Sequence, residues 1–472
     1  MFPNVLAARY ASAELVRIWS PEQKVVLERQ LWIAVLEAQK SLGVPVPEGA
    51  VEAYRKVVDQ VDLRSIRARE ERTRHDVKAR IEEFSDLAGY QLIHRGMTSR
   101  DLTENVEQLQ VRDSLLAIRD KTVAALARLG EGAAKYSELA ITGRSHNVAA
   151  QVTTVGKRFA SAGEELLVAL RALDHLIDDY PLRGIKGPVG TQQDQLDVFA
   201  GDVAKVAELE RRVAQHLGFK HVLNSVGQVY PRSLDFQVVA ALRQLASGPA
   251  NLAKTVRLMA GLELASEGFQ EGQVGSSAMP HKMNARSCER ISGFSAILGG
   301  HLAMVSALAG DQWNEGDVSC SVVRRVALPD AFFACDGLLE TFLHVVHDFV
   351  AFPHAVALEL GRYLPFLGGT KLMLAAVRAG LGREQAHHLV QRHSLAVADA
   401  LRAGSSRDND LLERLAEDPQ FPLSREELER LLGAPLELVG NAPAQVAAFV
   451  AQVEALVRAH PEAARYNPGR LL

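Results

Sequence analysis

The residues best suited to chemistry lie in one ten-residue segment, 275–284, which reads GSSAMPHKMN. It combines two hydroxyls, an ammonium and a carboxamide, and Pro280 prevents a helix before Lys282. A loop rich in N–H donors suits an anion whose charge grows during a reaction. The alternative is a polar connector between two long helices. We expect a loop that leads into a helix beginning near residue 285.

A histidine that could act as an acid or base, His146, follows the hydroxyl of Ser145 and precedes a stretch expected to be helical from about residue 155. An imidazole changes its protonation near neutral pH, which general acid–base catalysis requires. A lone histidine is more often a surface residue. The sequence around His146 does not by itself decide between these two interpretations.

A third polar group, Thr98, Ser99 and Asp101, stands just before a long apolar repeat that starts at Leu102. Hydroxyls and N–H groups at a helix start favour a bound anion, since the helix dipole is positive there. The same residues also suit a simple helix cap, and both roles can hold together. We expect Asp101 to cap the helix in either case.

These segments resemble the aspartase/fumarase superfamily, whose members eliminate or add across fumarate. Residues 276–284 match every fixed position of its SSxMPxKxN motif, and residues 143–146 and 96–105 resemble its GRTH and GxTSxDxxxN regions. The triplet at 75–77, which alone would be interpreted as a surface ion pair, resembles the HDV segment of the adenylosuccinate lyases. The resemblance extends over nearly the whole chain. It implies β-elimination of fumarate from adenylosuccinate and from SAICAR.

The resemblance implies a role for each matching residue. Ser276 would be the general base, and Lys282 would stabilise its alkoxide and the aci-carboxylate. His146 would protonate the leaving nitrogen, and Glu289 would orient its ring. The implied contacts to the succinyl-amine nucleotide are Arg9, Tyr10, His75, Asp76, Thr98, Ser99, Gln192, Ser277, Met279, Asn284, Arg290, Ser321 and Arg325. The resemblance implies neither a cofactor nor a metal.

One segment departs from the family pattern. Residues 313–320 read WNEGDVSC, where many relatives read WxERDxSH. Gly316 therefore lacks a guanidinium that usually helps to bind substrate anions, and Cys320 replaces a histidine. We expect either that another arginine, with Arg324 as the candidate, takes the place of this guanidinium, or that the substrate carboxylate is bound more weakly.

Composition excludes several other classes. The 472 residues are 47% hydrophobic and 23% charged with a formal net charge of -4, which gives no electrostatic footprint for nucleic acid or an anionic membrane. Three widely spaced cysteines argue against a disulfide framework or a structural zinc site. Three histidines of a C-terminal helix, His387, His388 and His393, are expected to face solvent. Without a signal-peptide pattern or an apolar run of about 18 residues, we expect a cytoplasmic protein.

Helical periodicity dominates the chain, and convincing strand patterns are nearly absent. A helix is expected from Pro21 to Gly43 and another from about 102 to 130. Further helices are expected near 155–180, 197–218, 234–268, 286–311, 325–350, 371–380, 383–402 and 442–459. We predict an all-α fold with three helical domains: 1–107, a central long-helix bundle at 108–358, and 359–472. The resemblance adds a homotetramer whose active sites lie where three subunits meet.

Two other functions stay open at this point. One is a different fumarate-releasing enzyme of the superfamily, such as an argininosuccinate lyase, a fumarase or a cycloisomerase, because fold and motif do not fix the substrate. His75, Asp76, Arg9 and Tyr10 favour a nucleotide. The other is a helical scaffold without catalytic activity, which would be expected to have lost its acid and base residues.

Overall fold

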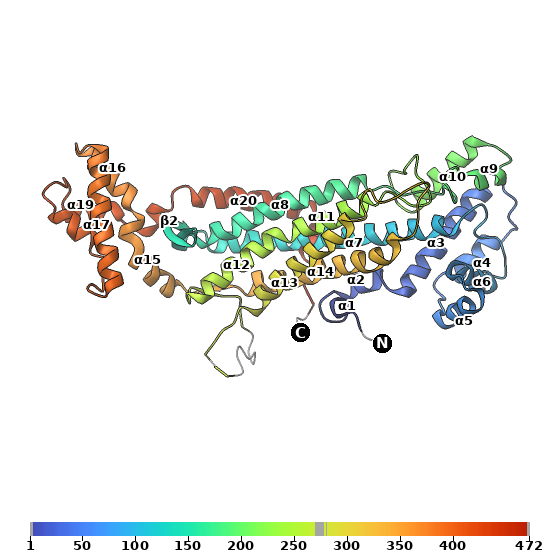
Figure 1. Ribbon diagram of the computed structural model, residues 1–472, viewed down its shortest axis with the longest axis horizontal. Coiled ribbons are helices and arrows are strands. Elements are labelled where there is room, and N and C mark those ends of the chain that lie inside the picture. Colours follow the sequence, from blue (N-terminus) through green and yellow to red (C-terminus); the bar gives the residue numbers. More distant parts are fainter. Residues whose placement is uncertain (1–2, 270–277, 280, 470–472) are drawn as a thin grey trace.

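The computed structural model describes residues 3–269, 278–279 and 281–469. Its centre is an elongated bundle of long helices, with a smaller helical group at each end (Figure 1). The bundle helices are α7 (Ser99–Lys135), α8 (Val155–Asp179), α11 (Ser233–Leu245), α12 (Ser247–Gly261), α13 (Arg286–Ser306) and α14 (Cys320–Asp348). The predicted all-α fold with a long central bundle is confirmed.

Helix α7 is the longest of these helices and runs through the middle of the bundle. Its buried apolar residues recur along most of its length, from Leu102 to Ala133, because neighbouring helices cover it on several sides. Asp101 caps its start as expected, accepting the N–H of Thr98 at Oδ2 at 2.8 Å. The helix ends at Lys135, beyond the predicted stop near residue 130.

The N-terminal group lies at one end of the bundle (Figure 1). Ser20 accepts the N–H of Gln23 at 3.1 Å and so caps α3, as the sequence predicts. Two later helices, α9 and α10, lie at the same end, and α10 packs against α3. The bounds are α1 (Val5–Arg9), α2 (Ala13–Ile18), α3 (Pro21–Ser41), α4 (Ala50–Lys56), α5 (Leu63–Thr73), α6 (Asp76–Ala88), α9 (Gln193–Val198) and α10 (Val203–His216).

The C-terminal group occupies the other end and has a small apolar core of its own, which includes Leu372, Leu389 and Leu411. Its last long helix, α20, returns along α7 and α8 and packs on the bundle. The division into three domains at 107 and 358 stays a prediction. The bounds are α15 (Pro353–Leu367), α16 (Gly369–Arg378), α17 (Arg383–Ala403), α18 (Leu411–Glu417), α19 (Arg425–Leu432), a 3-10 turn (Pro435–Leu438), α20 (Ala442–Ala459) and α21 (Pro461–Ala464).

Two details correct the sequence analysis. His393 of α17 does not face solvent: its Nε2 lies 2.7 Å from Oδ2 of Asp418, and its side chain is 18% exposed. The second correction concerns strands. β1 (Ala140–Ser145) and β2 (Val148–Thr154) form an antiparallel hairpin, and β3 (Ala265–Ser266) pairs with β4 (Val350–Ala351).

The hairpin matters because His146 is at its turn. His146 and Asn147 have φ angles of 51° and 62°, and a two-residue turn with positive φ at both positions matches the twist of the flanking strands. The expected helix start is confirmed, since α8 begins at Val155 directly after β2. Among the residues that the structure covers, no helix is long and apolar enough to cross a membrane.

Candidate active site

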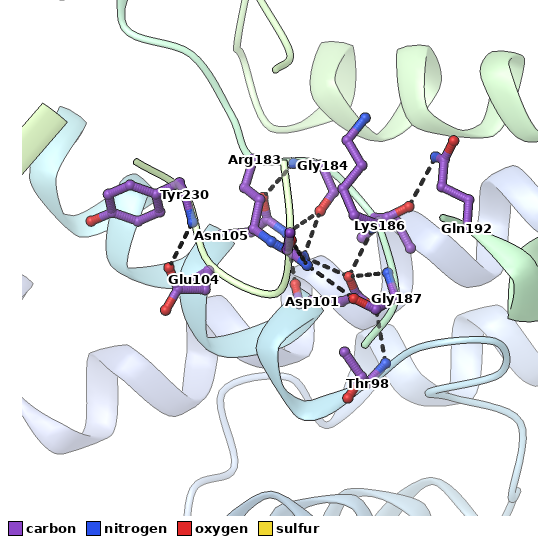
Figure 2. Close-up of polar contacts among 12 residues, drawn as sticks. Thr98, Asp101, Glu104, Asn105, Arg183, Gly184, Lys186, Gly187, Gln192 and Tyr230 are labelled. Atoms are coloured by element: carbon purple, nitrogen blue, oxygen red, sulfur yellow. Dashed lines mark hydrogen bonds and ion pairs between the residues drawn. The ribbon is translucent and has the colours of Figure 1, made fainter. Parts of the chain in front are cut away.

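A network of buried polar contacts surrounds the start of α7 (Figure 2). Oδ1 of Asp101 accepts three hydrogen bonds. The donors are Nη1 of Arg183 at 2.6 Å and the backbone N–H groups of Lys186 and Gly187 at 2.9 and 3.0 Å. The other oxygen of Asp101 accepts the N–H of Thr98. One buried carboxylate therefore fixes both the Thr98–Ser99 segment and the loop at 183–187.

The loop is fixed at a second point by Asn105, one turn further along α7. Asn105 accepts the N–H of Gly184 and donates to its carbonyl, both at 2.9 Å. Nε2 of Gln192 donates to the carbonyl of Ile185 at 3.0 Å, so this implied substrate contact lies beside the same loop. Gln192 is partly exposed, as are Thr98 and Ser99.

Further along the bundle, buried ion pairs between arginines and carboxylates extend this network. Glu104 contacts both Nη atoms of Arg232 at 2.9 Å, and Nε of Arg324 lies 2.7 Å from Oδ2 of Asp235. Arg324 also contacts Glu107 at 2.6 Å and the Tyr230 hydroxyl. Burial alone would lower the pKa of Arg324, but Glu107 and the neighbouring carboxylates hold it above its usual value.

These contacts exclude Arg324 as the substitute for the guanidinium missing at Gly316. Its side chain is 2% exposed and is already paired with carboxylates inside the bundle. Gly316 itself has a φ of +111°, and a Cβ there would lie 3.0 Å from Cγ2 of Val229. The backbone of this loop therefore favours glycine at position 316.

Arg100 joins this network to Ser321, one of the implied contacts to the nucleotide. Its Nη1 lies 3.2 Å from Oε1 of Glu104, and its Nη2 lies 3.4 Å from the Ser321 hydroxyl at the start of α14. Arg325 is exposed, one residue beyond the buried Arg324. The structure thus brings the 98–101 segment and Ser321 together. Arg100 was not among the site residues predicted from the sequence.

His75 and Asp76 begin α6 in the N-terminal group. Nδ1 of His75 accepts the N–H of Lys78 at 3.2 Å and caps the helix, and the ring is 54% exposed. Partial burial opposes ionisation of Asp76, but Arg80, at 2.9 Å, holds the pKa of Asp76 below its usual value. Helix capping therefore accounts for part of the HDV pattern, and the exposed ring remains accessible to a ligand.

Three of the predicted catalytic residues, His146, Lys282 and Glu289, lie towards the opposite end of α7. His146 is exposed at the hairpin turn, while the nearby Arg144 pairs with Glu359 of α15. A cavity of about 630 Å³ lies beside the hairpin and is lined by Arg144, Asn147 and Arg257.

A second cavity, of about 1050 Å³, adjoins the first, because Arg257 lines both. Lys282, Asn284 and Glu289 line it, and Lys282 and Glu289 are exposed. Glu289 lies 3.8 Å from Arg257, and both side chains are about half exposed. The expected pairing of Glu289 with His146 is not seen within one chain and stays a prediction.

Three other predicted contacts gather near the middle of the bundle. The Tyr10 ring meets Phe294 edge-on with centroids 5.2 Å apart, and the Arg290 guanidinium lies 5.5 Å from the same centroid. Arg9 is exposed and lies 5.9 Å from the Tyr10 ring.

The remaining predicted residues belong to the segment at 275–284. Met279 is 54% exposed. Ser276 and Ser277 lie outside the described residues, so the role of Ser276 as the base stays a prediction. The expected helix start near residue 285 is confirmed, since α13 begins at Arg286.

Besides the residues around Tyr10, a single chain thus brings together two separate groups of predicted residues, one towards each end of α7. Lys282, Asn284 and Glu289 line one of the two adjoining cavities, and His146 is next to Asn147, which lines the other. Thr98, Ser99, Gln192 and Ser321 lie at the other end of α7. Arg183, Glu104 and Arg257 support these groups but were not predicted to do so, because their partners are distant in sequence. Within the described ranges, no group of three or more His, Cys, Asp or Glu side chains could hold a metal.

Comparison with known proteins identifies the family. The chain matches the family described as "Lyase" over residues 13–299 and "Adenylosuccinate lyase C-terminus" over residues 365–449. The adenylosuccinate lyase of Saccharomyces cerevisiae is 35% identical over 454 residues, covering 95% of this chain and 94% of the yeast protein. That of Methanothermobacter thermautotrophicus is 31% identical, covering 92% of this chain and 95% of its own.

Solved structures show the same fold at lower identity. The 3-carboxy-cis,cis-muconate lactonizing enzyme from Pseudomonas putida superposes with a TM-score of 0.81 at 20% identity, over 96% of this chain and 100% of that one. A fumarate lyase from Mesorhizobium sp. BNC1 gives 0.80 at 20% identity, over 96% and 99%. The near-full-length identity to curated relatives, together with both family matches, shows that this chain belongs to the adenylosuccinate lyase family.

Proposed function

We propose that this chain eliminates fumarate from adenylosuccinate, giving AMP, and from SAICAR, giving AICAR. The observation that carries the proposal is the near-full-length match to adenylosuccinate lyases from yeast and from an archaeon. The residues of the acid–base set, His146, Lys282 and Glu289, are present and line or flank adjoining cavities. This retention argues against a scaffold that has lost its activity.

The chemistry assigns one step to each side of the scissile bond. Ser276, as an alkoxide stabilised by Lys282, takes the proton from the carbon beside the carboxylate, and the charge moves onto the carboxylate oxygens. The electron pair then forms the double bond of fumarate as the C–N bond breaks. His146 donates a proton to the leaving nitrogen, and Glu289 orients its ring.

The active site is shared between subunits of a homotetramer in this proposal. The two groups of predicted residues lie towards opposite ends of α7, so one substrate cannot contact both within one chain. Bundle helices also expose large apolar side chains, and a surface of this kind favours a protein interface. These side chains include Phe236, Leu258, Ile297, Val322 and Val326. The three buried free thiols fit a reducing compartment such as the cytoplasm.

The decisive experiment mixes two inactive variants. Ser276→Ala and His146→Ala each remove one proton-transfer group, and each is expected to lose about 10²- to 10⁴-fold in kcat on adenylosuccinate while staying tetrameric. Mixing them under conditions that exchange subunits should restore activity, because some shared sites then contain both native groups. Absorbance assays of turnover and light scattering of the assembled mass measure the two properties.

Controls separate the parts of the proposal. Each variant mixed with itself should stay inactive. If demonstrated subunit exchange restores no activity, the sites are not shared. If the native protein turns over argininosuccinate or malate and not adenylosuccinate, the substrate assignment is wrong.

A further inference from the structure

The last described residues of the chain, Tyr466–Gly469, share the lining of one cavity with the N-terminal segment that carries Arg9 and Tyr10. A buried group of charges joins the two termini. It consists of Lys121 on α7 with Asp336 and Glu340 on α14, and we call it the Lys121 cluster. The elimination described above does not use it.

The Lys121 cluster is almost completely buried. Nζ of Lys121 contacts the Asp336 carboxylate and lies 2.8 Å from Oε1 of Glu340, and the three side chains are 1%, 0% and 6% exposed. Burial alone would lower the pKa of Lys121, but the two carboxylates raise it, so the ammonium stays charged. Two carboxylates against one ammonium still require further hydrogen-bond donors.

Both termini supply those donors. At the N-terminal side, the N–H of Ser12 donates to Oδ2 of Asp336 at 2.5 Å, and Lys121 donates to the Ser12 hydroxyl at 2.8 Å. At the C-terminal side, the Tyr466 hydroxyl and the N–H of Gly469 both donate to Glu340, the latter at 2.9 Å.

The tail is also fixed along its backbone. Nη2 of Arg128 donates to the carbonyl of Tyr466 at 3.1 Å and to Oδ1 of Asn467 at 2.9 Å. Nε2 of His344 lies 2.7 Å from the carbonyl of Gly469. Specific contacts therefore bind this tail at Tyr466, Asn467 and Gly469.

Helix α14, which carries two members of the Lys121 cluster, also packs against Tyr10. A Cβ at Gly337, the neighbour of Asp336, would lie 2.9 Å from Cβ of Tyr10, so the helix backbone supports Tyr10 directly. Residues 8–14, Tyr466 and Gly469 together line a cavity of about 510 Å³. Ser12 is thus held by the cluster two residues beyond Tyr10.

We propose that Tyr466–Gly469 is a positioning element for substrate binding: by completing the Lys121 cluster, it holds Ser12 and therefore sets the place of Arg9 and Tyr10. The proposal rests on the proposed function, because Arg9 and Tyr10 are taken as contacts to the nucleotide. The match to the adenylosuccinate lyase C-terminus ends at residue 449, so it assigns nothing to the tail.

The test uses the full-length tetramer and Tyr466→Phe, with a second variant that ends at Arg465. Calorimetry gives the Kd of AMP, and steady-state assays give KM and kcat for adenylosuccinate. We expect Kd and KM to rise on the order of tenfold in Tyr466→Phe, because Glu340 loses a hydrogen bond to its charge. We expect kcat to change less than about twofold, since the reacting groups are untouched.

Tyr136→Phe is the matched control, because it removes a hydroxyl that donates to the carbonyl of Phe349 at 3.2 Å in the same bundle. It should leave Kd and KM unchanged. An intact Tyr466→Phe tetramer with native Kd and KM overturns the proposal, as does a loss of stability without a rise in KM. If the shortened chain does not assemble, Tyr466→Phe alone decides. Native protein that neither binds AMP nor turns over adenylosuccinate refutes the proposed function instead.

Discussion

The two ends of α7 differ in how far one chain completes them. At its start, Asp101, Asn105 and Arg183 are buried and bonded to one another or to the same loop, so the arrangement is rigid before any ligand arrives. At the hairpin end, His146 and Lys282 are exposed beside open cavities. The polar residues at the start of α7 are therefore already bonded within one chain, whereas the proposed reactive groups at the other end lie on the surface.

This difference between the two ends corresponds to two tasks of an enzyme, which are substrate binding and proton transfer. Substrate anions are held by preorganised donors, which a buried network supplies at low cost in reorganisation. Proton-transfer groups must meet a substrate held elsewhere, so they can remain exposed until a neighbouring surface covers them. Substitutions at the two ends should therefore affect different quantities.

The largest expected effect is on stability, at the buried end. Asp101→Ala leaves the Arg183 guanidinium buried without its carboxylate and removes the acceptor of three N–H groups, so the free energy of unfolding should fall by about 3–5 kcal/mol. Urea unfolding at a fixed protein concentration measures it. Asp113→Ala, which removes a partly exposed carboxylate of the same helix, is the control. A loss below about 1 kcal/mol would contradict the view of a rigid support.

At the exposed end the expected effect is on catalysis. Glu289→Gln should lower kcat about 10- to 100-fold, because the ring of His146 loses its orienting carboxylate, while the melting temperature stays unchanged. Glu454→Gln is a close control: Glu454 is 63% exposed and lies 3.9 Å from Arg458, much as Glu289 lies near Arg257. If Glu289→Gln keeps the native kcat, Glu289 does not orient His146 and forms only a surface ion pair with Arg257.

Much of this division was predictable from local sequence. Apolar spacing predicted α7, α8 and α20, and the cap at Asp101 followed from residues a few positions apart. The Asp101–Arg183 pair was not predictable, because its members are 82 positions apart and only the packed bundle joins them. The hairpin at His146 was missed because Asn147 stands where a turn glycine is usual.

The smallest expected effect concerns Gly316, which lies near the buried end. Gly316→Arg should destabilise the fold by about 1–3 kcal/mol, because a φ of +111° is strained for any residue with a Cβ. Gly316→Ala should cost nearly as much, since the strain lies in the backbone. Thermal unfolding gives the first result, and KM for adenylosuccinate shows whether the added guanidinium helps. Native stability with a lower KM would mean that the loop readily accepts the family pattern.

The unbroken course of α7 sets a condition on how the molecule can evolve. Its 37 residues span about 55 Å and connect the Thr98–Ser99 segment, the Lys121 cluster and the base of the hairpin. One inserted residue would turn everything beyond it by about 100° and swap buried faces for exposed ones. Substitutions can accumulate along this helix, whereas a change in its length would place the two ends of the molecule out of phase.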